Sequence, residues 1–408
     1  MGSSDGATAT RRPVAGVIEG FYGPPWSWDE RRAMIDAVAA WDGDWYVWAP
    51  KSEPRHRDAW AEPFTADEVS GFGSLRQRGV HVSVGLTPGF DATTDSVLAK
   101  LAPLDDVADG FTICFDDLDD HRGATRHATI ANAVLGGFGR PVWLVPTHYA
   151  GTSDSDYLRA LSDGLDPSIQ VMWTGRTVVT DTIHAHEADA RAAVTGNRPP
   201  LIWDNTPVND ALMRNLLHLG PYTGRADGLR DRISGVLANP MEFASASRPT
   251  VRSAIAWTRG RDHLAEWHEE IDALGLRGLA EATAFPGDPH WPGDEPTRGW
   301  WSAIADLPDP DDPRLARWVS AARDGARAVL ALVDVEGRIG EPERLRPVMG
   351  AVMAWRGWTT HEASTFGRGP RMRPVFGQDE SGRFVFEAAS VAESVALVDR
   401  VAARVLGG

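Results

Sequence analysis

Short apolar runs recur along the first part of the chain, and stretches with helical spacing separate them. Near-continuous apolar runs of this length are typical of strands that are buried on both faces. They recur about every thirty residues, which suits a repeating strand–helix unit. We predict eight strands, at residues 14–22, 45–49, 80–86, 111–115, 142–145, 169–173, 201–203 and 254–257.

Helix signals lie between these runs. Residues 27–41 begin with Ser27 and have Glu30 three positions later, the arrangement of a capping box. Residues 65–78 and 93–101 begin in a similar way. Strands that alternate with helices predict an α/β fold, either a closed (β/α)8 TIM barrel or an open sheet, and periodicity alone does not separate the two.

The ends of the predicted strands favour the barrel. Each run ends in polar, glycine or aromatic residues, for example at 19–23, 116–120 and 203–205. In a barrel all these ends meet at one rim, where active sites lie, whereas an open sheet brings only some of them together. We therefore expect a barrel with its active site at this rim.

The pattern changes after about residue 261. We predict helices at residues 262–274, 279–283, 314–335, 342–358 and 388–406, loops at 286–298 and 307–313, and a hairpin at 371–386 with its turn at 379–382. The sequence thus predicts a flexible N-terminus at 1–13, a (β/α)8 barrel domain at 14–260, and a mainly α-helical C-terminal domain at 261–408.

Length and charge agree with this division and limit the partners. A barrel takes about 250 residues, which leaves room for a second domain in a chain of 408. Hydrophobic residues make up 42%, so a large core is expected. The net charge of −16 argues against nucleic acid as a partner and disfavours a polyanionic substrate.

The single cysteine, Cys114, excludes an intrachain disulfide and favours a reducing cytoplasm. Residues 1–13 lack the apolar segment of a secretory signal, and no apolar run is long enough to span a bilayer. We expect a cytoplasmic protein with no membrane partner, although a signal that was already removed would leave no trace. The sequence leaves open whether the protein is a monomer or a homodimer.

Four acids follow the fourth predicted strand, and Asp116 and Asp117 come first. Cleaving a glycosidic bond needs one group to protonate the leaving oxygen and another to stabilise the anomeric cation. Neighbouring side chains point to opposite faces of a regular strand, but a turn at the strand end lets both reach one pocket. Their repulsion raises one pKa and provides a general acid. From the residues alone, a helix cap or an ion-binding acidic loop is the alternative.

A series of short motifs keeps a fixed order through the predicted barrel. It comprises residues 16–26, Tyr46, 49–51, 55–57, 115–117, 146–147 with Tyr149, 173–175, 203–205, 209–210, 219–222 and 239–240. Each motif alone is weak, but the ordered set is highly specific and covers about residues 14–260. It resembles glycoside hydrolase family 84, the O-GlcNAcase and bacterial β-N-acetylglucosaminidase family.

The resemblance implies a retaining exo-β-N-acetylglucosaminidase that acts on glycoconjugates with terminal β-linked N-acetylglucosamine. In such enzymes the 2-acetamido oxygen of the sugar attacks the anomeric carbon and forms an oxazoline, so no carboxylate nucleophile, cofactor or metal is implied. By resemblance, Asp116 accepts a hydrogen bond from the acetamido N–H and stays ionised. Asp117, with its pKa tuned upward, protonates the leaving oxygen and later deprotonates water.

The resemblance assigns the remaining positions to sugar binding. Gly20 lets the backbone approach a sugar hydroxyl, Lys51 binds a ring hydroxyl, and Tyr149 binds the acetamido oxygen. The acetamido methyl pocket is implied at Trp203, with Val145, Thr174 and Val178 as neighbours, and ring hydroxyls are implied at Asn205, Asp210 and Asn239. For each of these residues, a purely structural role in a turn, core or surface is the alternative.

Two other functions stay open at this point. One is an endo-acting hyaluronidase-type hexosaminidase, which the acidic charge disfavours, and the other is a non-catalytic barrel that binds N-acetylhexosamine. The natural aglycone, the choice between gluco and galacto sugars, and the role of residues 366–386 are also open. That basic, aromatic segment either shapes the leaving-group side of the cleft or forms a simple surface hairpin.

Overall fold

The computed structural model describes residues 12–76, 78–338, 341–370, 376–386 and 393–407. Eight parallel strands close into a barrel in sequence order, and β8 pairs with β1. The (β/α)8 prediction is therefore confirmed. The strands are β1 Val14–Glu19, β2 Trp45–Trp48, β3 His81–Leu86, β4 Gly110–Cys114, β5 Val142–Val145, β6 Gln170–Trp173, β7 Leu201–Asp204 and β8 Gly235–Ala238.

The predicted position of the eighth strand is wrong. Residues 254–257 lie inside helix α7 (Ala244–Thr258), in which most residues are buried. A helix that is buried on nearly all sides gives the same short apolar run as a buried strand, so periodicity cannot separate them. The true strand β8 has only four residues and starts at Gly235. In consequence Asn239, and not the segment after residue 257, follows the eighth strand at the rim.

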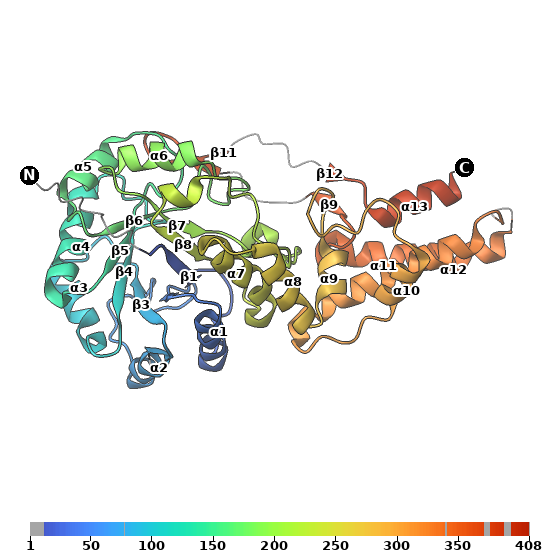
Figure 1. Ribbon diagram of the computed structural model, residues 1–408, viewed down its shortest axis with the longest axis horizontal. Coiled ribbons are helices and arrows are strands. Elements are labelled where there is room, and N and C mark those ends of the chain that lie inside the picture. The colour runs from blue at the N-terminus through green and yellow to red at the C-terminus, as the bar shows by residue number, and fades with distance from the viewer. Residues whose placement is uncertain (1–11, 77, 339–340, 371–375, 387–392, 408) are drawn as a thin grey trace, which may run out of the picture.

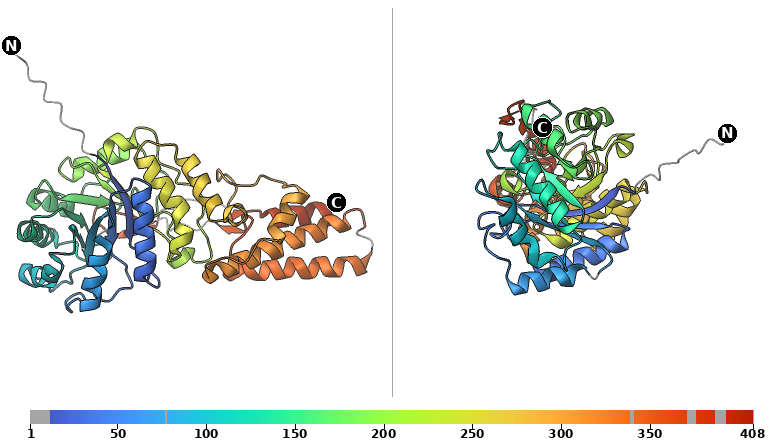
Figure 2. Two further views of the ribbon diagram at one scale, coloured as in Figure 1. Left: turned by 60° about the horizontal axis from the view of Figure 1, so that its bottom comes forward. Right: turned by 90° about the vertical axis from the view of Figure 1, so that its left-hand side faces the viewer.

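Helices surround the barrel and fix its strands (Figures 1 and 2). They are α1 Trp28–Ala40, α2 Ala66–Arg76, α3 Thr94–Leu101, α4 Ala124–Phe138, α5 Asp156–Gly164, α6 Ala185–Val194 and α7. The predicted capping box at Ser27 and Glu30 starts α1. Arg31 of α1 then donates two 2.9 Å hydrogen bonds to Glu19, which is fully buried at the end of β1. This buried ion pair joins α1 to the end of β1, so the Glu19 carboxylate is paired within the fold.

A second group of helices extends away from the barrel and makes the molecule elongated (Figures 1 and 2). It comprises α8 His263–Ala273, α9 Arg277–Thr283, α10 Arg298–Ala305, α11 Ala316–Val335, α12 Pro342–His361 and α13 Leu397–Leu406. The sequence did not predict α10. The exact domain boundary at residue 260 stays a prediction.

The last helix is shorter than predicted. The prediction covered residues 388–406, but α13 begins at Leu397, because the backbone of Ala396 is extended with φ −60° and ψ 149°. Residues 393–394 instead form strand β12 (Glu393–Ser394), which pairs with β9 (Gly369–Pro370). The predicted residues 388–392 lie outside the described residues.

The predicted hairpin is present where the structure describes it. Strands β10 (Phe376–Gln378) and β11 (Phe384–Phe386) pair in antiparallel register around the predicted turn, whereas residues 371–375 lie outside the described part. The hairpin lies over the barrel, and β12 and α13 lie with the second group of helices (Figure 1). The C-terminal part of the chain therefore returns to the barrel.

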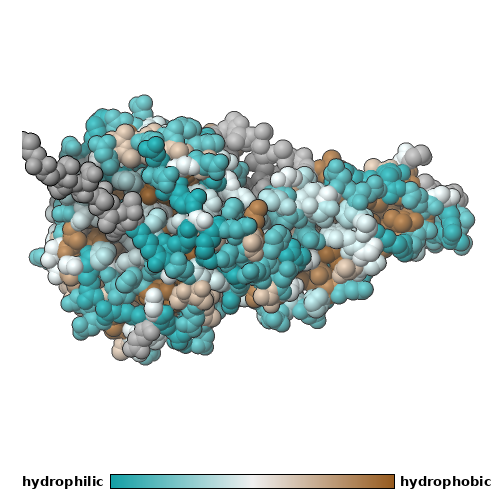
Figure 3. All heavy atoms as spheres, viewed as in Figure 1, coloured by the Kyte–Doolittle hydropathy of each residue, from teal (hydrophilic) through white to brown (hydrophobic). Residues whose placement is uncertain are grey.

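Hydrophilic side chains cover most of the face that Figure 3 shows. Within the described residues, no helix combines the length and the apolar character that a bilayer crossing requires.

Candidate active site

Asp116 and Asp117 follow β4 at the rim of the barrel. Asp117 has φ 57°, a left-handed conformation that is uncommon outside glycine and is often found at functional sites. This turn interrupts the alternation of the strand, so both carboxylates face the same cation, Lys51. Lys51 Nζ contacts Asp116 Oδ2 and lies 3.8 Å from Asp117 Oδ2.

Lys51 lies just beyond the end of β2 and is itself buried. Burial alone would lower the pKa of Lys51, but the charges of Asp116 and Asp117 outweigh it and raise that pKa. Its ammonium also lies 5.2 Å from the centre of the Trp203 ring. Lys51 is therefore a permanent cation that joins the acids after β4 to the aromatic residue of β7.

Asp117 is surrounded by donors. Tyr22 donates a 2.7 Å hydrogen bond from its hydroxyl to Oδ2, and the Tyr149 hydroxyl lies 3.3 Å from Oδ1. Arg57 donates a 2.8 Å hydrogen bond to the Tyr22 hydroxyl and lies 3.5 Å from Asp117 Oδ2. These contacts favour the ionised carboxylate.

The two acids have opposite pKa shifts. Burial raises the pKa of Asp116 in spite of its contact with Lys51. Burial also opposes ionisation of Asp117, but the charge of Lys51 and the hydrogen bond from Tyr22 outweigh it and lower the pKa of Asp117. This is the reverse of the expected order, because the sequence alone did not reveal how many donors gather around Asp117.

A second network joins the strand ends on the other side of the rim. The Gly20 N–H donates to Asn239 Oδ1 at 3.1 Å, and Asn239 Nδ2 donates to Asn205 Oδ1 at 2.8 Å. The same Asn205 oxygen accepts a 3.1 Å bond from Trp203 Nε1, and Asn205 Nδ2 donates to the Val178 carbonyl at 2.6 Å. The ends of β1, β7 and β8 and the loop after β6 are thus joined by amide side chains.

Glycine is required at position 20 by close packing. A Cβ atom there would lie 2.1 Å from Cζ2 of the Trp203 ring. The ring is only 4% exposed and its N–H is bonded to Asn205, so it has little room to move. The backbone just after β1 therefore passes directly against the Trp203 ring.

A buried ion pair supports this side of the rim. Arg225 donates a 2.7 Å bond from Nε to Asp204 Oδ2, and Nη2 contacts Oδ1. The Tyr222 hydroxyl donates to the same carboxylate at 2.6 Å. Arg225 also donates to the carbonyl of Thr180, in the loop that carries Val178. Asp204, between Trp203 and Asn205, is thereby fixed.

Thr174 and Asp210 complete the predicted set. The Thr174 N–H donates to the Tyr149 carbonyl at 3.1 Å, and its hydroxyl donates to the Thr177 carbonyl at 2.9 Å. Asp210 Oδ2 accepts a 2.7 Å bond from the Tyr22 N–H, and burial raises the pKa of Asp210. Asp210 and Tyr22 also line a cavity of about 250 Å³. The structure thus brings all the predicted site residues to one rim of the barrel.

Comparison with known proteins identifies the family. The model of the beta-N-acetylglucosaminidase family matches residues 15–284, more than half of the chain. The chain belongs to the beta-N-acetylglucosaminidase family. This confirms the resemblance to glycoside hydrolase family 84, and the match extends beyond the predicted barrel boundary at residue 260.

Two curated relatives share about a third of their aligned residues with this chain. Protein O-GlcNAcase from Mus musculus is 32% identical in an alignment of 286 positions, which covers 63% of this chain and 31% of the relative. Protein O-GlcNAcase from Rattus norvegicus is 32% identical in an alignment of 280 positions, which covers 62% of this chain and 30% of the relative. The chain spans about a third of the length of these two relatives.

Two solved structures share the fold. A variant of Thermobaculum terrenum O-GlcNAc hydrolase is 21% identical with a TM-score of 0.70, covering 84% of this chain and 88% of that one. CpGH84B is 22% identical with a TM-score of 0.76, covering 86% of this chain and 74% of that one. Both similarities extend well beyond the barrel.

Sequence reasoning missed two residues of the site in this member of the beta-N-acetylglucosaminidase family. Tyr22 and Arg57 contact Asp117 but were not assigned a role. Both lie in loops that follow strands, Tyr22 after β1 and Arg57 after β2, and inside family-like motifs at residues 16–26 and 55–57. A polar residue at the rim of a barrel is itself a signal for the site, and it would have found both.

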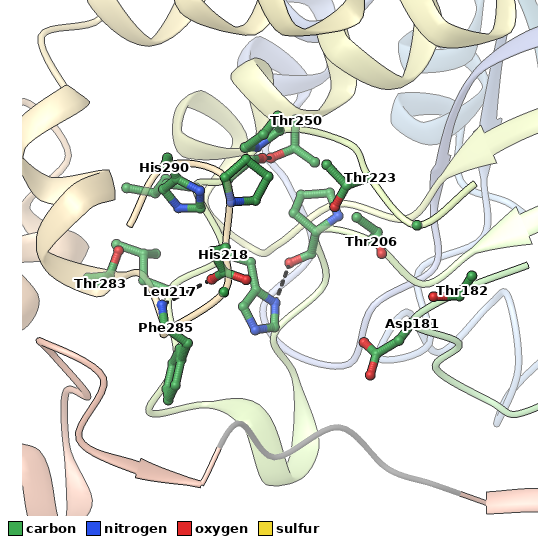
Figure 4. Close-up of a pocket in the computed structure, with 18 residues that line it drawn as sticks. Asp181, Thr182, Thr206, Leu217, His218, Thr223, Thr250, Thr283, Phe285 and His290 are labelled. Carbon is green, nitrogen blue, oxygen red and sulfur yellow. Dashed lines mark hydrogen bonds between the residues drawn. The ribbon is translucent and has the colours of Figure 1, made fainter. Parts of the chain in front are cut away.

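Figure 4 shows a separate cavity of about 450 Å³, which neither of the paired acids lines. Residues of 206–224 and 283–290 line it, among them His218 and His290, together with Asp181, Thr182 and Thr250, and none of these is a predicted site residue. His218 Nδ1 lies 2.9 Å from the Val208 carbonyl oxygen. Across the described parts of the chain, no three His, Cys, Asp or Glu side chains group together as a metal site would require.

Proposed function

We propose that this chain is a retaining exo-β-N-acetylglucosaminidase that cleaves terminal β-linked N-acetylglucosamine by substrate-assisted catalysis through an oxazoline. One observation carries the proposal. Asp116 uses Oδ2 to contact Lys51, while Oδ1 is buried and has no hydrogen-bond partner among the described residues. A buried acceptor without a donor is costly, and the acetamido N–H of a bound sugar supplies that donor.

The reaction follows from this placement. The acetamido oxygen attacks the anomeric carbon as the glycosidic bond breaks, and Asp116 stabilises the positive charge that develops on the amide nitrogen. Asp117 protonates the leaving oxygen. Water then attacks the oxazoline and gives its proton to Asp117, which restores the β-configuration. Tyr149, whose hydroxyl lies beside Asp117, holds the acetamido oxygen in place.

The lowered pKa of Asp117 sets a condition on this reaction. Tyr22 and Arg57 favour its carboxylate form in the free protein. A sugar that enters the site displaces water and places the leaving oxygen beside Asp117. The added burial raises the pKa of Asp117 toward the protonated form that an acid needs.

The second network forms the sugar pocket in this proposal. Trp203 is 4% exposed and is held by Asn205, so its ring presents a fixed wall to the acetamido methyl group. Thr174 and Val178 border this wall. Polar groups for the ring hydroxyls are supplied by Gly20, Lys51, Asn205, Asp210 and Asn239.

The relatives support a protein-linked substrate. Both curated relatives are named Protein O-GlcNAcase, so we infer that N-acetylglucosamine on protein is the natural substrate class. The net charge of −16 continues to disfavour anionic polymers such as hyaluronan.

Release of 4-methylumbelliferone from its β-N-acetylglucosaminide tests the activity, and proton NMR of the released sugar tests whether the β-configuration is retained.

We expect Asp117→Asn to slow a methyl glycoside far more than a 2,4-dinitrophenyl glycoside, because the activated leaving group needs little protonation. Asp116→Asn should slow both. Asp119→Asn is the matched control, since the Asp119 side chain is 90% exposed in the same acidic segment. Equal losses on both glycosides in Asp117→Asn would remove Asp117 as the acid. Binding of N-acetylglucosamine without turnover would instead indicate a non-catalytic barrel.

A further inference from the structure

The C-terminal hairpin of β10 and β11 is bonded to the loops that carry site residues. Gln378 of β10 donates from Nε2 to the Thr147 carbonyl at 2.8 Å, and its Oε1 accepts the Ala150 N–H at 2.8 Å. The Phe376 carbonyl accepts the Val178 N–H at 2.7 Å. The hairpin therefore spans the loops after β5 and β6, although it lies more than 190 positions away in the sequence.

The turn of the hairpin is fitted to the same surface. Gly382 has φ 77°, and a Cβ atom there would lie 1.8 Å from His148 Nε2. His148 is buried, and its carbonyl accepts a 2.7 Å bond from Arg191. The turn thus rests on a fixed ring, and only glycine fits at this position. The close fit holds the hairpin in one place on the rim.

The position of the hairpin places an aromatic side chain beside Tyr149, which itself lies beside Asp117. The Phe384 ring of β11 lies 5.9 Å from the Tyr149 ring between centroids, at an angle of 61°. Tyr149 in turn lies 3.3 Å from Asp117 Oδ1. Tyr149 is 6% exposed and Phe384 is 49% exposed, so Phe384 is the outer member of this series. Val385 and Phe386 beside it are exposed as well.

We propose that β11 forms the leaving-group side of the active site, with Phe384 as the contact for an aglycone that presents an apolar or aromatic face. The proposal rests on the proposed function, in which Asp117 protonates the leaving oxygen. The group attached to that oxygen extends outward from Asp117, past Tyr149, and reaches the exposed ring of Phe384.

The chemistry of β11 favours an apolar aglycone over a second sugar. Its three side chains are two phenylalanines and a valine, which offer no hydrogen-bond donor or acceptor. Exposed apolar side chains that gather on a protein surface are typical of a contact site. A sugar aglycone would need polar partners for its hydroxyls, whereas an apolar face gains from covering these rings.

The test compares kcat/KM of the full-length wild type and the Phe384→Ala variant on three β-N-acetylglucosaminides, with phenyl, methyl and N-acetylglucosaminyl aglycones. Each variant is compared with the wild type on the same substrate, so the intrinsic reactivity of the leaving group cancels. We expect kcat/KM for the phenyl glycoside to fall roughly 3- to 10-fold, mainly through KM. The other two substrates should change less than about twofold.

Two further variants separate packing from recognition. Phe384→Leu keeps an apolar side chain and should lose less than Phe384→Ala. Met349→Ala removes an apolar side chain that is 61% exposed on α12, and it should change none of the three substrates. Inhibition by free N-acetylglucosamine should be unchanged in all variants, because the sugar pocket is intact.

Two results would overturn the proposal. Equal losses on all three substrates would mean that Phe384 acts only by supporting Tyr149. A selective loss on the disaccharide would mean that β11 binds a sugar. Calorimetric binding of the thio-linked phenyl β-N-acetylglucosaminide, which resists hydrolysis, tests the hairpin even if the wild type turns over none of the substrates. Weaker binding to Phe384→Ala supports the subsite, and equal binding refutes it.

Discussion

The contact between Tyr22 and Asp117 gives a direct test of how the site controls its acid. The Tyr22 hydroxyl donates to Asp117 Oδ2 at 2.7 Å and accepts from Arg57 at 2.8 Å. Tyr22→Phe removes this donor and leaves the ring in place. Because the lost hydrogen bond stabilises the ionised carboxylate, the pKa of Asp117 should rise.

The structure sets the size of this rise. A hydrogen bond to a charged group contributes about 1.5–3 kcal/mol, and about 1.4 kcal/mol corresponds to one pKa unit. Tyr22 is 45% exposed, so water replaces part of the lost donor, and the lower end of the range applies. We therefore expect the pKa of Asp117 to rise by about 1 unit.

The assay is the pH dependence of kcat/KM on 4-methylumbelliferyl β-N-acetylglucosaminide. An acid must be protonated to act, so activity falls as pH rises through its pKa, and a higher pKa moves this alkaline limb to higher pH. Asp116 and Asp117 interact, so the pKa read from this limb describes the pair of carboxylates together. The quantity to compare is the shift of the limb between the wild type and Tyr22→Phe. Asp119→Asn serves as the control and should leave the limb in place. A lower kcat/KM with an unmoved limb, or a limb that moves to lower pH, would refute the reasoning.

Two further predictions concern the residues that support the proposed sugar pocket. Gly20→Ala places a Cβ atom 2.1 Å from the Trp203 ring, and overpacking of about 1–3 kcal/mol should lower kcat/KM by about tenfold. Gly136→Ala, in α4 with no neighbour within 4 Å of the new Cβ, should leave kcat/KM unchanged, and a similar loss there would exclude a local effect. Arg225→Met leaves the buried Asp204 carboxylate without its cation and should cost about 3–5 kcal/mol of unfolding free energy, measured by denaturant titration. Adding Asp204→Leu should recover part of this loss, and a double variant as unstable as the sum of both would contradict the pairing.

The local pattern of apolar residues was sufficient to predict the positions of most barrel strands. Seven of the eight strands lie where the apolar runs predicted them. A strand that is buried on both faces has apolar side chains at consecutive positions, so it is visible in the sequence as an apolar run. The capping box at Ser27 and the hairpin turn at residues 379–382 are also local signals, and both predictions match the structure. The ordered motifs were sufficient to predict the family.

Burial that comes from long-range packing was not visible in the sequence. Residues 254–257 form part of a helix that is covered on nearly all sides, so their apolar run was taken for the eighth strand. The true strand β8 is identified by its pairing with β1 and β7, which no local pattern contains.

The sequence by itself determined which residues are candidates for the site, and the tertiary structure decided their electrostatic state and surroundings. Closure of the barrel brings Gly20 to Asn239 across 219 positions, and it brings Tyr22 and Arg57 to Asp117. These contacts reverse the expected pKa order of the two acids, because a pKa depends on the donors and charges around a group. The contact of the hairpin with residues 147–150 is likewise decided by tertiary structure, since these partners lie in the loop after β5, more than 220 positions earlier in the chain.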